Sequence, residues 1–263
     1  MADFTGGLAA RRMPPPSVAI GVEAVGLVAV PFAIWIMPTQ WNLEAMALTF
    51  AGGAIGGFGL ILFYRAMSLD LIGVVAPITA VIAAALPTAV GVLVAGEKLH
   101  LGQGAGIVAG LVAIAMINGA GGRDARLGAG RALGLAIVAG VGFGLFFILY
   151  HAGSSAGVTA FVSGRAGSAV VALTYALVTR VPIMPQASGL RLIAIGGALD
   201  GFGVVLYMFA TVHGLLSISA LLTSFYPAFT IVCARLLLKE RLNAMQASGA
   251  VLAVVAIALI AAA

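Results

Sequence analysis

Apolar runs of about 20 residues recur from one end of the chain to the other, and they constrain its fold more than any single motif does. The 263 residues are 62% hydrophobic and only 8% charged, whereas a soluble domain carries roughly 25% charged residues. The mean hydropathy of +1.19 describes the whole chain and not one anchor segment. The sequence therefore predicts an all-α integral membrane protein.

Charged residues and Pro/Gly breaks divide the apolar sequence into nine predicted spans. The spans cover residues 16–37, 46–66, 73–95, 102–118, 132–151, 158–179, 191–212, 216–238 and 244–262. Arg11, Arg12 and three prolines precede the first long apolar run. That order is the reverse of a cleaved signal peptide, so we expect none.

Two stretches of the predicted spans repeat each other 144 residues apart. GGAIGGFGLILF (52–63) and GGALDGFGVVLY (196–207) are identical at seven of twelve positions. The register continues, at an offset of 143, into GEKLHLGQGAG (96–106) and KERLNAMQASG (239–249). Internal repeats of multi-span chains are typical of secondary transporters.

The repeat divides the chain at its longest polar connection, GAGGRDARLGAGR. We expect a first unit over residues 1–120, a linker over residues 121–131 and a second unit over residues 132–263. At the same offset, most of the counterpart of span 132–151 would lie ahead of Met1. We therefore expect four complete spans and then five, with MADFTGGLAARR as the tail of a missing first helix. A start further upstream and a natural nine-span variant both fit this expectation.

The doubled pattern resembles the EamA-type transporters of the drug/metabolite transporter superfamily. Each unit has a third helix rich in glycine and aromatic residues, and a Glu–basic–Leu turn (97–99 and 240–242) ahead of a glycine-containing last helix. Pro227 stands where such repeats carry a proline in the fourth helix, whereas the first unit has Ala84 there. The resemblance implies ten helices in two inverted five-helix halves around a central cavity. It also implies transport of small metabolites or drugs, more commonly by export.

Asp200 is a carboxylate near the middle of the span at 191–212. Such a charge costs about 2.5–3.5 kcal/mol on insertion scales, so Asp200 should face a cavity or a partner. It could couple transport to protons, bind a cationic group of the substrate, or serve as a protonated acid bonded to a neighbouring helix. The repeat carries Gly56 at the matching position, so the helix geometry does not require the charge.

Glu23 and Arg165 place opposite charges in equivalent spans of the two units. With the offset of 144, Arg165 aligns with Gly21 and Glu23 with Gly167, so the charges are two positions apart. An ion pair between the halves is one arrangement, although equivalent helices need not touch. EamA-like repeats often carry an arginine early in their second helix, which Arg165 fits. A substrate contact and a snorkelling or cavity-facing charge remain as alternatives.

Glu97 and Glu240 occupy the same turn in both units, which favours a structural task such as capping the next helix over a gating role. Tyr207 lies seven residues, or two helical turns, after Asp200 and therefore on the same helix face. We include Tyr207 with Asp200, Glu23 and Arg165 as candidates for contact with substrate or coupling ion.

Basic residues lie mostly in the connections at one end of the predicted helices. Positive-inside reasoning would make that end cytoplasmic and place the C-terminus outside. Members of the family are usually drawn with both termini inside, so the sequence leaves the orientation open.

The functional expectation is a secondary transporter of the bacterial inner membrane, not an enzyme. No Walker motif, no metal-ligand spacing and no cofactor motif occurs, and the 13 basic residues form no face for nucleic acid. The expected partners are a small-molecule substrate and membrane lipid, and a homodimer is compatible with the sequence. The alternatives are a membrane-embedded lipid-modifying enzyme and a non-transporting membrane subunit.

Overall fold

Helices make up all the regular secondary structure that the computed structural model describes, namely residues 1–69, 72–94, 100–119, 125–212, 226–238 and 243–262. In chain order these are α1 (Ala2–Ala10), α2 (Pro15–Gly26), η1 (Leu27–Ala29), α3 (Val30–Ile36), α4 (Leu43–Leu69), α5 (Ile72–Val94), α6 (Leu101–Gly119), α7 (Ala125–Gly153), η2 (Ser154–Ala156), α8 (Val158–Val178), η3 (Ala187–Gly189), α9 (Leu190–Val212), α11 (Tyr226–Leu237) and α12 (Ala244–Ala262). This confirms the all-α prediction for the described residues.

Five helical segments are long and apolar enough to cross a membrane: Pro15–Ile36, Leu43–Leu69, Gly130–Ala156, Val158–Val178 and Ala187–Ala210. Shorter apolar helices occupy Val74–Pro87, Leu101–Ile114 and Ala244–Leu259. Each segment coincides with a predicted span. Of the remaining predicted span, 216–238, the structure describes the part from Tyr226 onwards, which forms α11. The chain is a multi-pass membrane protein.

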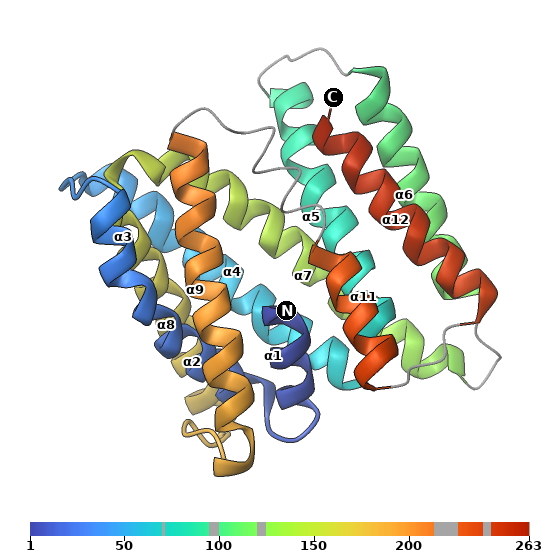
Figure 1. Ribbon diagram of the computed structural model, residues 1–263, viewed down its shortest axis with the longest axis horizontal. Helices are drawn as coiled ribbons and strands as arrows, with labels where there is room; N and C mark the ends of the chain where they lie inside the picture. Colours follow the sequence, from blue (N-terminus) through green and yellow to red (C-terminus); the bar gives the residue numbers. More distant parts are fainter. Residues whose placement is uncertain (70–71, 95–99, 120–124, 213–225, 239–242, 263) are drawn as a thin grey trace.

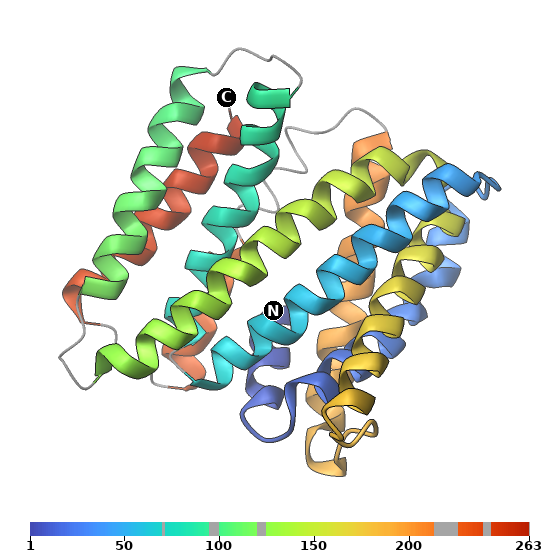
Figure 2. The same cartoon turned by 180° about the vertical axis from the view of Figure 1, so that it is seen from behind.

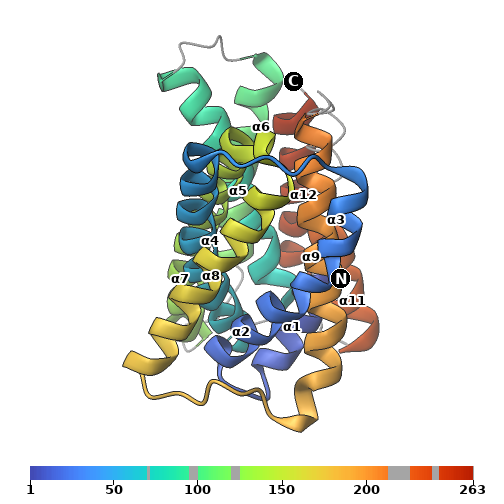
Figure 3. The same cartoon turned by 90° about the vertical axis from the view of Figure 1, so that its left-hand side faces the viewer.

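The helices form two groups that lie side by side. Helices α5, α6, α11 and α12 make one group, in which α6 and α12 pack closely together (Figure 1). In the other group, α4 contacts both α7 and α8, while α9 contacts α1 and α2 (Figure 2). Helices α2, α3, α8 and α9 stand together on one side of the molecule (Figure 3). The second group encloses the candidate site.

The first predicted span is not one continuous helix. Helix α2 ends at Gly26, a 3₁₀ turn follows, and α3 restarts at Val30 with Pro31 in its first turn. Proline is tolerated there because the first amides of a helix have no intrahelical acceptor. The break places Gly26 against Arg165, whose guanidinium carbon would lie 3.0 Å from an added Cβ.

A tight turn at Gly157 ties the start of α8 to the loop after α3. Gly157 has φ of +62°, which side-chain-bearing residues rarely adopt. Its neighbour Val158 donates its backbone N–H to the Pro38 carbonyl at 3.0 Å. At the other end of the bundle, the Ser17 hydroxyl donates to the Pro182 carbonyl. Each of these proline loops therefore holds the first turn of a helix from the other half of the chain.

Large apolar side chains cover much of the outer surface. Val170, Leu177, Leu206 and Val251 are all at least half exposed, which suits contact with lipid tails because those tails are as apolar as leucine. The loop at residues 36–43 and its flanks carry the exposed Trp35 and Trp41. Tryptophans at that level are typical of a membrane interface.

The structure describes parts of the predicted linker at residues 121–131 and of the segment at residues 1–12. Helix α7 begins at Ala125, so the predicted linker at 121–131 overlaps the first turns of a helix. Residues 2–10 form α1, and Phe4, Ala9 and Ala10 of this helix are buried. The offset of 144 carries residues 2–10 onto residues 146–154, where α7 ends.

Candidate functional site

Arg165 joins the two carboxylates that the sequence singled out. Its Nη1 lies 2.7 Å from Oε2 of Glu23 and 2.6 Å from Oδ2 of Asp200. The three residues come from α8, α2 and α9, and Arg165 and Glu23 are 4% and 8% exposed. Glu23 and Arg165 thus form the ion pair between halves of the chain that the sequence left open, and Asp200 shares it.

Glu23 has a partner for each of its oxygens. Arg165 bonds Oε2, and the Ser168 hydroxyl donates to Oε1 at 2.7 Å. Ser168 follows Arg165 by three residues, which is one helical turn, so both face α2 from α8. Removing one partner of a buried pair leaves the other charge uncompensated. The Glu23 carboxylate is therefore held in place by α8.

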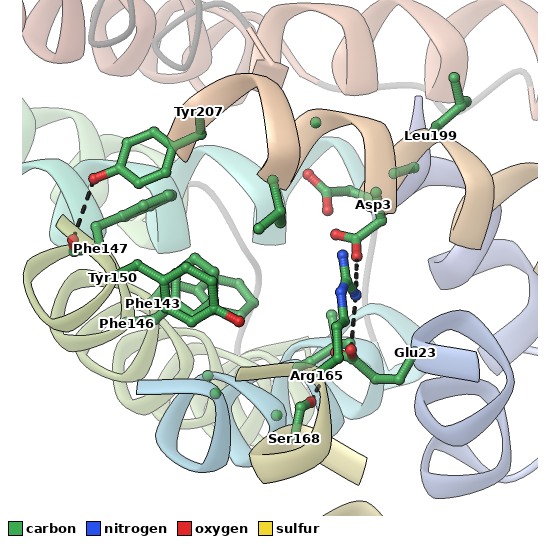
Figure 4. A pocket seen from close by; sticks show the side chains of 18 of the residues that line it. Asp3, Glu23, Phe143, Phe146, Phe147, Tyr150, Arg165, Ser168, Leu199 and Tyr207 are labelled. Carbon is green, nitrogen blue, oxygen red and sulfur yellow. Dashed lines mark hydrogen bonds and ion pairs between the residues drawn. The ribbon is translucent and has the colours of Figure 1, made fainter. Parts of the chain in front are cut away.

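A cavity of about 390 Å³ lies beside this ion-pair network. Asp3, Glu23, Arg165, Ser168 and Asp200 all line it. In Figure 4 the charged side chains gather on one side of the cavity, and the rings of Phe143, Phe146, Phe147, Tyr150 and Tyr207 gather on the other. The volume and the mixture of apolar walls with a few polar groups are typical of small-molecule sites.

Asp3 is a cavity residue that the sequence reasoning missed. It lies on α1, which packs against α9, and it lines the same cavity as Asp200. Asp3 was overlooked because residues 1–12 were interpreted only as the tail of a helix. A carboxylate among apolar residues was the available signal, the same one that identified Asp200.

Tyr207 lines the same cavity as Asp200, in agreement with their shared helix face. Its hydroxyl donates to the Phe147 carbonyl at 3.1 Å, and the two rings lie 5.2 Å apart between centroids. Tyr207 thereby links α9 to α7. Glu97 and Glu240, the predicted structural turns, lie outside the described residues.

The repeat places matching positions around the cavity but gives them different chemistry. Asp3 and Phe147 are 144 residues apart and both line the cavity, as do Gly56 and Asp200. In each pair one member is a carboxylate and the other is not. The charge is therefore confined to one wall, while the opposite wall is aromatic or bare backbone.

Glycines allow the helices around the site to approach closely. A Cβ on Gly53 would lie 1.9 Å from the Gly164 carbonyl oxygen, and one on Gly201 would lie 2.2 Å from the Gly26 carbonyl oxygen. The first contact joins α4 to α8 and the second joins α9 to α2. Small residues at such crossings are the usual means of close helix packing in membranes, and here they bring Arg165 within reach of both acids.

Comparison with known proteins agrees with this architecture. A solved crystal structure of another protein aligns with a TM-score of 0.60 at 15% identity, covering 99% of this chain and 96% of that chain. At that identity the likeness shows a shared fold only. No curated protein sequence matches the chain. The model of the EamA-like transporter family matches residues 130–262, just over half of the chain. The chain therefore belongs to the EamA-like transporter family of the drug/metabolite transporter superfamily.

Proposed function

We propose that this protein is a secondary transporter that moves a small solute across the bacterial inner membrane by alternating access, most simply as an exporter. The observation that carries the proposal is the cavity of about 390 Å³ with ion-paired Arg165, Glu23 and Asp200 in its wall. Ionisable groups inside a membrane bundle are costly and generally mark substrate or ion pathways. Membership of a transporter family supports the same function.

Two inverted halves would supply the moving parts. In the repeat, α4 corresponds to α9, α8 to α2, and α7 to α1. The contacts of α4 with α8 and α7 therefore have counterparts in the contacts of α9 with α2 and α1. The same exchange pairs the Pro38 loop on α8 with the Pro182 loop on α2. Helices α4 and α9 run in opposite directions through the bundle (Figure 1). These relations support an inverted repeat, in which one half rocks against the other around a fixed site.

A membrane-embedded enzyme is the weaker alternative. Lipid-modifying chemistry needs a nucleophile, base or metal group close to the headgroups. Among the described residues, the polar groups that come together are an arginine, its carboxylate partners and a serine that donates to Glu23. Their hydrogen bonds fit an ion-pair network better than a nucleophile with its base.

Untargeted metabolite profiling of cells and medium tests the proposed function. Cells expressing the wild type are compared with cells expressing Asp200→Asn and with cells carrying an empty vector. We expect at least one solute to accumulate in the medium with the wild type and to fall to the empty-vector level with Asp200→Asn.

Glu44→Gln is the matched control, because Glu44 is an exposed acid at the start of α4, away from the cavity. It should export as the wild type does. If no solute accumulates in the medium with the wild type, the proposed function is wrong. If Asp200→Asn exports the solute normally, the role of Asp200 is wrong.

A further inference from the structure

The formal charges around the cavity do not balance. Asp3, Glu23 and Asp200 contribute three carboxylates, whereas Arg165 is the one cation among the described lining residues. An uncompensated charge inside a bilayer is strongly unfavourable. A proton on one carboxylate or an occupant with a positive charge would reduce the imbalance.

Only two of the carboxylates are available to such an occupant. Arg165 and Ser168 hydrogen-bond both oxygens of Glu23, and the Glu23 side chain is 9% exposed. The Asp200 side chain is 30% exposed and bonds Arg165 through Oδ2 alone. Asp3 makes no hydrogen bond or salt bridge with the described residues and also faces the cavity (Figure 4). Asp3 and Asp200 therefore form the acceptor pair.

Arg165 does not offer its positive charge to a ligand. Its Nε and Nη2 have no hydrogen-bond partner among the described residues, and less than 1 Å² of each atom is accessible. Gly26 covers the guanidinium, and the Phe161 ring centroid lies 5.2 Å from its central carbon. An anionic group in the cavity would face the carboxylates of Asp3 and Asp200 and an arginine of which only 4% is exposed.

The aromatic wall of the cavity indicates what kind of molecule carries the positive charge. Phe143, Phe146 and Phe147 on α7 present aromatic surface on the side of the cavity away from the charged side chains, and Tyr207 joins them from two turns beyond Asp200 on α9 (Figure 4). Aromatic faces hold apolar bodies and also attract cations. No group of three described His, Cys, Asp or Glu side chains converges as a metal site. This chemistry favours an organic ammonium ion over a bare metal ion.

We propose that the cavity selects organic cations, holding an ammonium group between Asp3 and Asp200 and the apolar body against the aromatic wall. The proposal rests on the transport function proposed above and names the substrate class of the same site. Arg165 then acts as a positioning residue: it holds Asp200 towards the cavity and does not touch the solute.

The test is calorimetric titration of the purified, detergent-solubilised chain with three probes that share one phenyl ring and differ in their polar group. Phenethylamine carries an ammonium group, hydrocinnamate a carboxylate and phenethyl alcohol no charge, each on one phenyl ring. We expect phenethylamine to bind at least about tenfold more tightly than either of the others, because only its ammonium group can form an ion pair with the carboxylates of Asp3 and Asp200.

Two variants assign the binding to the acceptor pair. Asp3→Asn leaves every bond of Arg165 intact, so it should fold normally and lower the affinity for phenethylamine about tenfold or more. Asp200→Asn should lower this affinity by a similar factor, and Glu44→Gln should bind phenethylamine as the wild type does.

Equal or tighter binding of hydrocinnamate, wild-type affinity for phenethylamine in Asp3→Asn, or no binding of any probe would overturn the cation proposal. None of these outcomes touches the transport function, which the metabolite profiles test independently. Solute export in those profiles together with hydrocinnamate binding here would leave a transporter of anions.

Discussion

Arg165 is the residue on which the site depends most. One nitrogen, Nη1, serves both Glu23 and Asp200, so a single substitution leaves two carboxylates without their cation. Removing one partner of a buried ion pair typically costs about 3–5 kcal/mol. We expect Arg165→Gln to lower the thermal unfolding midpoint strongly in detergent, as followed by intrinsic fluorescence.

The exposed Arg191 at the start of α9 provides the control, since Arg191→Gln removes the same charge without a buried partner. The double variant Glu23→Gln/Arg165→Gln should lose less stability than the two single changes added together, because residues in one network couple. Additive losses would show that the pair is not coupled.

At this scale the sequence predicted individual charges but not how they meet. Asp200 was recognisable because a carboxylate among apolar residues is expensive, and Arg165 and Glu23 because the repeat set them in equivalent spans. Whether they touched depended on which helix faces meet, and spacing along one chain does not carry that information. Asp3 reaches the cavity only because α1 packs against α9, and the sequence does not carry that contact.

Helix crossings dominate at the scale of elements. Gly201 and Gly203 both lie within one turn of Asp200 on α9. A Cβ on Gly201 would strike the Gly26 carbonyl oxygen at 2.2 Å, whereas a Cβ on Gly203 would meet nothing within 4 Å. Overpacking a tight contact costs about 1–3 kcal/mol. Gly201→Ala should therefore lower the unfolding midpoint by several degrees, and Gly203→Ala should leave it unchanged or raise it. Equal unfolding midpoints for the two variants would contradict the close contact between α9 and α2 at Gly201.

Helix positions were predictable from sequence, because in a bilayer the backbone must bond to itself and helices satisfy that need locally. The interruption of the first span at residues 27–29 was not predicted, although Gly26 and Pro31 frame it. A Gly/Pro pair within an apolar run signals a local break. Its consequence, room for the Arg165 guanidinium against α2, depends on tertiary packing.

The described residues give the whole molecule a basic end. The connections from α1 to α2 and from α8 to α9 lie at the lower end of the bundle in Figure 1, and the connection from α3 to α4 lies at the opposite end. Arg11, Arg12, Arg180 and Arg191, in or next to the first two connections, are exposed, as are Trp35 and Trp41 at the third. Because these arginines lie outside the bundle and not within it, the positive-inside rule applies to them directly. We predict that the basic end is cytoplasmic and that the loop at residues 37–42 faces outward.

Cysteine accessibility in intact cells measures this orientation. In a Cys233→Ala background, a membrane-impermeant maleimide should label Trp41→Cys and should label Met184→Cys only after the membrane is permeabilised. Both native side chains are more than four-fifths exposed, so access to the reagent is not limited by burial. The reverse labelling pattern would invert the orientation, and labelling of both sites in intact cells would indicate two orientations.

The separation between crossings and cavity walls has a consequence for how the chain can vary. The glycine contacts that hold α4 on α8 and α9 on α2 recur in both halves, whereas the paired positions Asp3 with Phe147 and Gly56 with Asp200 differ. Substitutions at the cavity positions can therefore change what the wall presents to an occupant without disturbing the contacts that hold the helices together. The chemistry of the cavity can vary while the crossings stay the same.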